Sequence, residues 1–195
     1  MEEQAKQYEK EQAKLAQLGF TLERMKGWGI NNRVLYRRAY GRLSIDDDAP
    51  LTNEHTRYDL ASITKPLVVG MLTLRAMEAG RLCLWDRLGT FLDAPADKRD
   101  ITIAQIRTHT AGFPTGLHLW ELSDQPENSA ETILNAPLAS PPGARVRYCC
   151  AGFILLGQLL ECLYGMDLKE LAMKEVFWPL KMRDTCLLYT SPSPR

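Results

Sequence analysis

The sequence has no excess of charge of either sign. Its 195 residues include 24 Lys and Arg against 24 Asp and Glu, which gives a formal net charge of zero. A broad nucleic-acid-binding surface needs a basic excess or a basic stripe. Arginines gather within residues 33–42, but Asp46, Asp47 and Asp48 follow them directly and balance their charge. We therefore expect no nucleic-acid partner for this chain.

A long apolar run is also missing. The best apolar stretch, residues 151–160, is interrupted by Gly157 and Gln158 and is followed by Glu161, whereas a membrane-spanning helix needs roughly 20 apolar residues. The first residues, Met-Glu-Glu-Gln-Ala-Lys, contain no apolar segment of a secretory signal. From these absences we expect no membrane span and, unless a leader has been lost, a cytoplasmic protein.

Cysteine and histidine are few and lack the spacing of metal ligands. The five cysteines form an odd number without a Cys-x-x-Cys pair, which indicates reduced thiols and not a disulfide framework or a zinc site. The three histidines, His55, His109 and His118, are scattered along the chain. The glycines form no phosphate-binding loop. We therefore expect no metal and no cofactor.

The composition is that of a folded protein, because 45% of the residues are hydrophobic and 25% are charged. Residues 2–18 predict a weakly amphipathic helix, residues 27–32 a turn rich in glycine and asparagine, and residues 34–43 a strand. A two-stranded sheet does not stand alone in water. Either strands outside this chain complete the sheet, or the fold is mostly helical.

Helical patterns dominate the rest of the chain. Residues 62–79 predict a helix that ends at Gly80, and a capping box of Thr102 and Gln105 predicts a short helix through Arg107. Further helices are expected over residues 131–135, over the apolar residues 151–164, and from residue 167 towards residue 177.

The sequence Ser62-Ile63-Thr64-Lys65 suggests nucleophilic catalysis. Residues that lie three apart on a helix share a face, so the Ser62 hydroxyl and the Lys65 amine are neighbours. Partial desolvation would push Lys65 towards the neutral amine, which can accept a proton. The alternative is that Ser62 is an N-cap and Lys65 a solvated residue of the first helical turn.

Tyr148 lies where a loop meets the apolar helix of residues 151–164. A tyrosine at such a junction can act as a phenolate base if a lysine lies nearby. The alternative is a packed tyrosine whose hydroxyl has a hydrogen-bond partner. The neighbouring Cys149 and Cys150 can equally be buried, inert thiols.

Four segments together resemble the beta-lactamase-related serine hydrolases, a family that includes class C beta-lactamases, D-alanyl-D-alanine peptidases and related esterases. The segments are YDLASITK at 58–65, RTHTAGFP at 107–114, PGARVRY at 142–148 and AGFILLG at 151–157. They occur in the family's order within residues 34–185. The resemblance implies an α/β (α+β) fold of the beta-lactamase/transpeptidase type, with a helical region and an antiparallel sheet that is incomplete in this chain.

The resemblance also implies roles for individual residues. Ser62 would be the acylated nucleophile, Lys65 would lower its proton affinity and relay the proton, and Tyr148 would be the base that also protonates the leaving group. His109 matches a segment that is mainly structural in the family. Cys150 stands where the family has a substrate-binding Asn, and a thiol cannot supply the paired donor and acceptor of an amide.

The family's third motif, Lys-Thr-Gly or His-x-Gly on a late strand, does not follow Tyr148. We expect a helical N-terminal extension over residues 1–26, a C-terminally truncated domain over residues 27–185, and a non-native tail over residues 186–195. The predicted function is a serine hydrolase that forms an acyl-enzyme with a small ester or amide. The alternative is a non-catalytic member of the family that only binds or serves as a scaffold.

Overall fold

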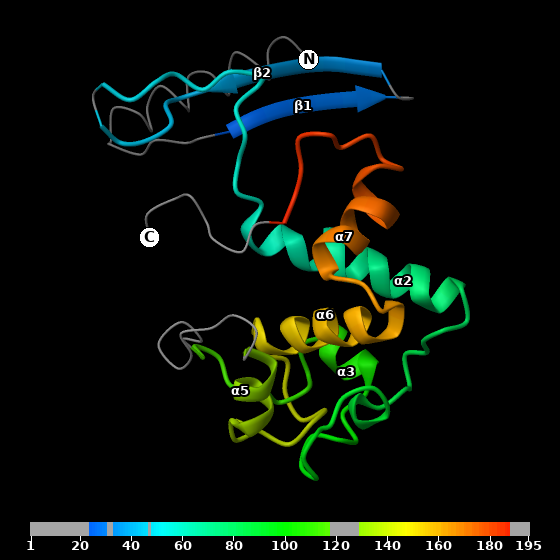
Figure 1. The fold of residues 1–195 in the computed structure, drawn as a ribbon. Helices are drawn as coiled ribbons and strands as arrows, with labels where there is room; N and C mark the ends of the chain where they lie inside the picture. Colours follow the sequence, from blue (N-terminus) through cyan, green and yellow to red (C-terminus); the bar gives the residue numbers. More distant parts are fainter. Residues whose placement is uncertain (1–23, 31–32, 47, 118–128, 188–195) are drawn as a thin grey trace. The chain divides into compact units, whose positions relative to one another are not determined.

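The computed structural model of the protein describes residues 24–30, 33–46, 48–117 and 129–187. The chain divides into two compact units, Met1–Tyr58 and Asp59–Arg195. The first unit contains a β-hairpin and the second is helical, as Figure 1 shows for the elements in chain order. The helix predicted over residues 2–18 lies outside the described residues.

The hairpin of the first unit pairs β1 (Arg24–Ile30) with β2 (Arg33–Tyr40) in antiparallel register. The register shifts between Trp28 and Gly29, which marks a bulge in β1. The strand predicted over residues 34–43 is confirmed, although it begins one residue earlier and ends at Tyr40. The turn predicted to include Gly27 and Gly29 is wrong at these two residues, because pairing with β2 holds both in the ladder.

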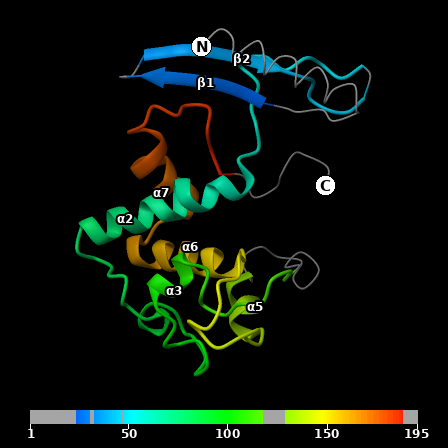
Figure 2. The same ribbon diagram turned by 180° about the vertical axis from the view of Figure 1, so that it is seen from behind.

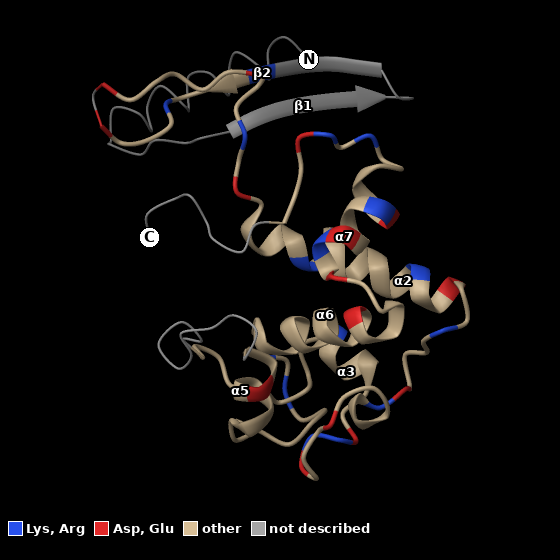
Figure 3. Ribbon diagram, in the orientation of Figure 1, with Lys and Arg blue, Asp and Glu red and all other residues tan. Residues whose placement is uncertain are grey.

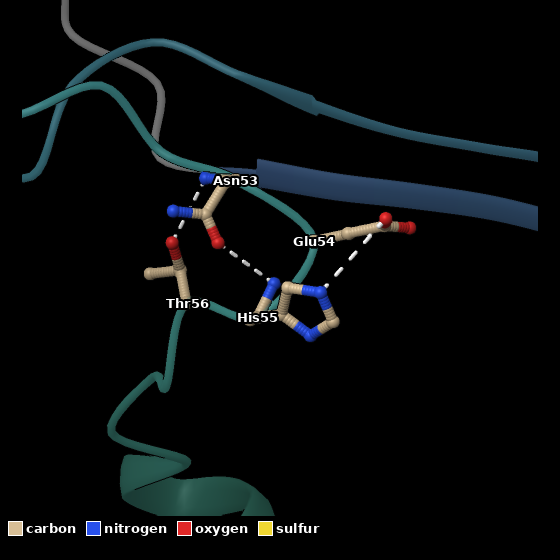
Figure 4. Close-up of polar contacts among 4 residues, drawn as sticks. All are labelled: Asn53, Glu54, His55 and Thr56. Carbon is tan, nitrogen blue, oxygen red and sulfur yellow. Dashed lines mark hydrogen bonds and ion pairs between the residues drawn. The ribbon is translucent and has the colours of Figure 1, made fainter.

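A short turn follows the hairpin and is shown in Figure 4. The Asn53 backbone N–H donates to Thr56 Oγ1 at 2.9 Å, and the His55 backbone N–H donates to Asn53 Oδ1 at 2.9 Å. This side-chain bond to a backbone two residues on is the usual reason for asparagine in turns. The His55 side chain is 88% exposed and its Nε2 lies 4.0 Å from Glu54 Oε1.

The second unit begins with a helical segment that changes its pitch. A 3₁₀ turn, η1 (Ala61–Ile63), is followed by a π-helical segment, η2 (Lys65–Gly70), and then by α2 (Met71–Glu78). The helix predicted over residues 62–79 is thus confirmed, with irregular turns at its start. Gly80 ends it with φ of +67°, and its N–H donates to Met77 O at 3.0 Å.

Five shorter elements within the described residues follow the loop after α2, and two of them begin at the caps that the sequence predicts. The capping box predicted for α3 (Ile103–Arg107) is confirmed, since Thr102 and Gln105 exchange side-chain bonds with each other's backbone N–H. Asp167 caps α7 (Leu168–Ala172) by accepting from Lys169 N and Glu170 N. The remaining elements are η3 (Leu88–Thr90), α5 (Ser129–Asn135) and η5 (Met173–Phe177).

The core of the second unit forms around α6 (Ala151–Tyr164), which contacts α3, α5, α7 and η2. Figure 2 shows α6 between α3 and α5 on one side and α2 and α7 on the other. Leu155, Leu156, Leu159 and Leu160 are all 0% exposed. Burying each such side chain stabilises the fold by about 1.5–3 kcal/mol. The residues that precede and follow α6 are therefore held by the best-packed element of the unit.

Acidic and basic residues are interspersed along the second unit (Figure 3), and an ion pair joins Arg75 on α2 to Glu175 on η5 at 2.9 Å. No single helix among the described residues is long and apolar enough to cross a membrane. The pair formed by α6 and α7–η5 reaches that length and apolar character only when both halves are counted together, and the two halves are bent by 82° relative to each other.

Candidate active site

Ser62 lies in η1, directly after a residue with a strained backbone. Ala61 has φ of +43°, in the left-handed region that residues with a side chain rarely adopt. The Ala61 N–H donates to Asp59 Oδ1 at 2.8 Å, and the Ile63 N–H donates to Leu60 O at 2.8 Å, so local bonds hold this conformation. Strain of this kind costs about 1–3 kcal/mol and clusters at functional sites.

The N-cap role considered for Ser62 is wrong. Ser62 lies inside η1, and the N-cap position of η2 belongs to Thr64, which makes no capping bond with its side chain. The Ser62 side chain is exposed, and its hydroxyl accepts a hydrogen bond from the Lys65 ammonium group. The hydroxyl is therefore accessible to solvent and bonded to a lysine, and it does not cap the start of a helix.

Lys65 begins η2 and connects Ser62 to Tyr148. Its Nζ lies 3.2 Å from Ser62 Oγ and 5.1 Å from the centre of the Tyr148 ring. Single π-helical turns are rare and are frequently found at functional sites. The spacing expected from the Ser62-x-x-Lys65 pattern is confirmed, since both groups lie on one face of the helical segment.

The pKa of Lys65 differs from the sequence expectation. Partial burial acts to lower this pKa, but hydrogen bonding to Tyr148 and Cys150 outweighs the burial, so the pKa is raised above 10.5. The shift is therefore opposite in direction to the expectation that desolvation drives Lys65 towards the neutral amine. The lysine is half-buried and has electron-rich partners, so it remains an ammonium cation at neutral pH.

Tyr148 stands at the end of the loop that leads into α6, with 53% of its surface exposed. Hydrogen bonding to Ser62 is the main cause that lowers the pKa of Tyr148 below 10.0, and hydrogen bonding and attraction to Lys65 lower it further. The alternative of a packed tyrosine is wrong about burial, but its expectation that the hydroxyl has hydrogen-bond partners is confirmed. The phenol therefore loses its proton more readily than an isolated tyrosine does.

Cys150 faces the same ammonium group. Its thiol interacts with Lys65 and helps to raise the lysine pKa. Cys150 is exposed while Cys149 is 8% exposed, so the expectation that both thiols are buried is right for Cys149 and wrong for Cys150. All five cysteines are free thiols, as the sequence predicts.

His109, expected to belong to a mainly structural segment, lies against Tyr148 in the site. It follows α3 with φ of +57°, and its ring centre lies 4.6 Å from that of Tyr148 and 5.1 Å from that of Phe153. The Cys149 N–H donates to His109 Nδ1 at 3.4 Å. The expectation of a hydrogen-bonded loop histidine is therefore confirmed. The contact between His109 and Tyr148 was not predicted from the sequence, because the two residues lie far apart in the chain.

The arrangement has the parts of nucleophilic catalysis. A hydroxyl, a phenol with a lowered pKa and an ammonium group lie within contact distance of one another, which is the geometry of an activated nucleophile. Within residues 24–30, 33–46, 48–117 and 129–187, no group of three or more His, Cys, Asp or Glu side chains is placed to hold a metal ion.

Comparison with known proteins gives consistent matches. A family model described as "Beta-lactamase" matches residues 29–193. A protein of Escherichia coli K12 named as a D-alanyl-D-alanine carboxypeptidase is 26% identical over 176 residues, which cover 80% of this chain and 41% of the relative. The chain thus spans about two fifths of the length of the curated relatives that it matches.

Two solved structures extend the comparison. The penicillin-binding protein of Bacillus halodurans has a TM-score of 0.70 and 28% identity, with 87% of this chain and 53% of that chain covered. EstCE1, a hydrolase with promiscuous acyltransferase activity, has a TM-score of 0.75 and 25% identity, with 91% and 51% covered. These matches confirm the expected beta-lactamase/transpeptidase-like fold, of which the described residues show two strands and the helical region.

Proposed function

Because the chain belongs to the beta-lactamase family, we propose that it carries the nucleophile-bearing part of a serine hydrolase that acts on an ester or amide through an acyl-enzyme. The observation that carries this proposal is the placement of one ammonium group, Lys65 Nζ, 3.2 Å from Ser62 Oγ and 5.1 Å from the ring centre of Tyr148. Ser62 is the nucleophile, Tyr148 the base, and Lys65 the cation that stabilises both in their charged forms.

In the acylation step, Ser62 Oγ forms a bond to the substrate carbonyl carbon and its proton passes to the Tyr148 phenolate. The carbonyl electron pair moves onto oxygen and returns when the bond to the leaving group breaks. The leaving alkoxide or amine takes the proton from Tyr148. The lowered pKa of Tyr148 and the raised pKa of Lys65 support this order, since the phenolate then accepts the proton beside a permanent positive charge.

In the deacylation step, water gives a proton to the Tyr148 phenolate while its oxygen bonds to the acyl carbon. The bond between that carbon and Ser62 Oγ then breaks, and Ser62 recovers a proton from Tyr148. The exposure of Ser62 and Tyr148 supports this step, because water can reach both groups. The Lys65 ammonium again stabilises the serine oxygen as it leaves.

The substrate class that we propose is a small molecule with an acyl bond. The names of the relatives point to D-alanyl-D-alanine carboxypeptidase, penicillin-binding and ester-hydrolase chemistry. Cys150 replaces the amide expected at the substrate-binding position, so we propose that Cys150 contacts substrate with its exposed thiol. This contact provides one weak donor and one weak acceptor instead of an amide pair.

The test compares the intact protein that contains this chain with its Ser62→Ala variant. A fluorophosphonate probe labels active-site serines, and a chromogenic acyl ester reports turnover. We expect stoichiometric labelling and turnover in the unsubstituted protein, and a loss of both by orders of magnitude in the variant. Ser44→Ala is the matched control, because the exposed Ser44 hydroxyl donates to Asp46 at 2.7 Å.

Equal turnover by the protein and its Ser62→Ala variant would refute the proposed nucleophile. Absence of labelling in a folded protein would support the alternative of a non-catalytic family member. Because Ser44→Ala removes a serine hydroxyl outside the candidate site, labelling and turnover that are lost only in Ser62→Ala report on the site and not on a general loss of stability.

A further inference from the structure

We propose that His109 is a positioning residue, which in its neutral form holds Tyr148 beside Ser62 and Lys65. This inference rests on the proposed function, because it assigns His109 a part in placing the proposed base. It differs from the sequence expectation, in which His109 belongs to a mainly structural segment.

The backbone bonds on either side of Tyr148 both lead to His109. The Arg147 N–H donates to the His109 carbonyl oxygen at 2.8 Å, and the Cys149 N–H donates to His109 Nδ1 at 3.4 Å. The residues before and after the tyrosine are thus tied to one histidine. A side chain that is itself 53% exposed receives its position from this pair of bonds.

The imidazole ring adds a direct contact. Its centre lies 4.6 Å from the Tyr148 ring with an interplanar angle of 44°, and 5.1 Å from the Phe153 ring of α6. Aromatic pairs in this range contribute about 0.5–1.5 kcal/mol beyond the area they bury. His109 is therefore packed between the base and the best-buried helix of the unit.

The left-handed backbone explains how one residue makes all of these contacts. With φ of +57°, His109 turns its carbonyl oxygen and its side chain towards the same loop. Histidine is one of the residues that adopt this conformation more often than most. Such a conformation costs free energy, and strained conformations of this kind cluster at functional sites.

The hydrogen bond from Cys149 requires Nδ1 to be without a proton, so the neutral ring carries its proton on Nε2. Burial and repulsion from Lys65 lower the pKa of His109 and favour this neutral form. The groups that face the ring are the Lys65 cation from η2, the Tyr148 phenol and the Cys149 backbone from the loop, and the uncharged Phe153 from α6. Protonation would remove the acceptor and place a second cation beside Lys65.

Two variants separate the acceptor from the ring. His109→Asn keeps an acceptor near the place of Nδ1 and tolerates a left-handed backbone, but removes the ring. His109→Phe keeps a ring and removes the acceptor. We expect the phenylalanine variant to lower kcat by about 10- to 100-fold, since a base displaced by an ångström can cost that much, and the asparagine variant to recover most of that loss. His55→Asn, at the exposed turn of Figure 4, is the matched control.

The pH profile distinguishes positioning from a structural role. With two groups that must both lose a proton, log(kcat/KM) rises with a slope of about two below the His109 pKa and about one between that pKa and that of Tyr148. In His109→Asn the steeper limb disappears. A profile with the same slopes in the protein and in both variants would overturn the inference.

A readout without turnover keeps the inference separate from the proposed function. In a titration of the Tyr148 phenol by absorbance, we expect the pKa to rise towards 10.0 in His109→Phe, because the phenol leaves Lys65. In nitrogen NMR of the unsubstituted protein, we expect His109 to carry its proton on Nε2. An unchanged Tyr148 titration in a folded variant, or a proton on Nδ1, would refute positioning by His109 even if Ser62 proves to be the nucleophile. If Ser62 proves not to be the nucleophile, the same two measurements still decide the inference.

Discussion

The Lys65 ammonium nitrogen lies 5.1 Å from the centre of the Tyr148 ring, although the two residues are far apart in the sequence. Lys65 reaches this place from η2, and Tyr148 reaches it from the loop before α6. Contacts between α6 and η2 bring the two elements together. The pKa of each group then depends on the other, with the phenol favoured as phenolate and the amine as ammonium.

Tyr148→Phe tests the base. Tyr148 must lose its proton before it can accept one from Ser62, so kcat/KM rises with pH through an apparent pKa below 10.0. Without the phenol this rise disappears, and we expect turnover to fall by about 10²–10⁴-fold. The measurement is the pH profile of ester hydrolysis by both proteins. A rising limb that survives in the variant would assign it to another group.

Lys65→Met tests the cation. Removing the positive charge withdraws the attraction that favours the phenolate, so the pKa of Tyr148 rises and fluorophosphonate labelling of Ser62 slows. An absorbance titration and labelling rates measure the two effects. Lys169→Met on α7 is the control, since Lys169 is exposed. Equal labelling rates in both variants would contradict a role for Lys65.

Cys150→Asn tests the substrate position. An amide supplies a donor and an acceptor together, whereas the thiol supplies only weak versions of each. We expect the asparagine variant to lower KM for peptide or amide substrates more than for simple esters, with Ser62 labelling retained. Steady-state kinetics on both substrate classes measure this difference. Cys150→Ala, which keeps neither group, should raise KM for both.

Gly112→Ala tests the loop that carries the tyrosine. Gly112 has φ of +85°, and a Cβ there would overlap the Ser140 carbonyl oxygen. Gly116 has φ of +76°, but a Cβ there would meet no atom within 4 Å. The left-handed backbone costs about 1–2 kcal/mol in both alanine variants, and the overlap adds about 1–3 kcal/mol at residue 112 alone. Urea unfolding of the two variants checks this difference, and equal losses would contradict the close approach.

Local signals in the sequence predicted the helical elements well. The Thr102–Gln105 capping box, the end of α6 at Gly165 and the Asp167 cap all have their partners within a few residues. Such bonds form between neighbours, so the sequence is sufficient to predict them. The same reasoning was wrong for β1, where Gly27 and Gly29 suggested a turn. Strand pairing is a contact between segments, and it overrides local preference.

The sequence by itself determined that Ser62 and Lys65 share one face, because residues three apart on a helix are neighbours whatever surrounds them. Only the tertiary structure decided which groups surround that pair. The packing of α6 against η2 and α3 places Tyr148, Cys150 and His109 there. It also decided the direction in which the Lys65 pKa shifts, because a pKa depends on partners in space, and Tyr148 and Cys150 are distant from Lys65 in the chain.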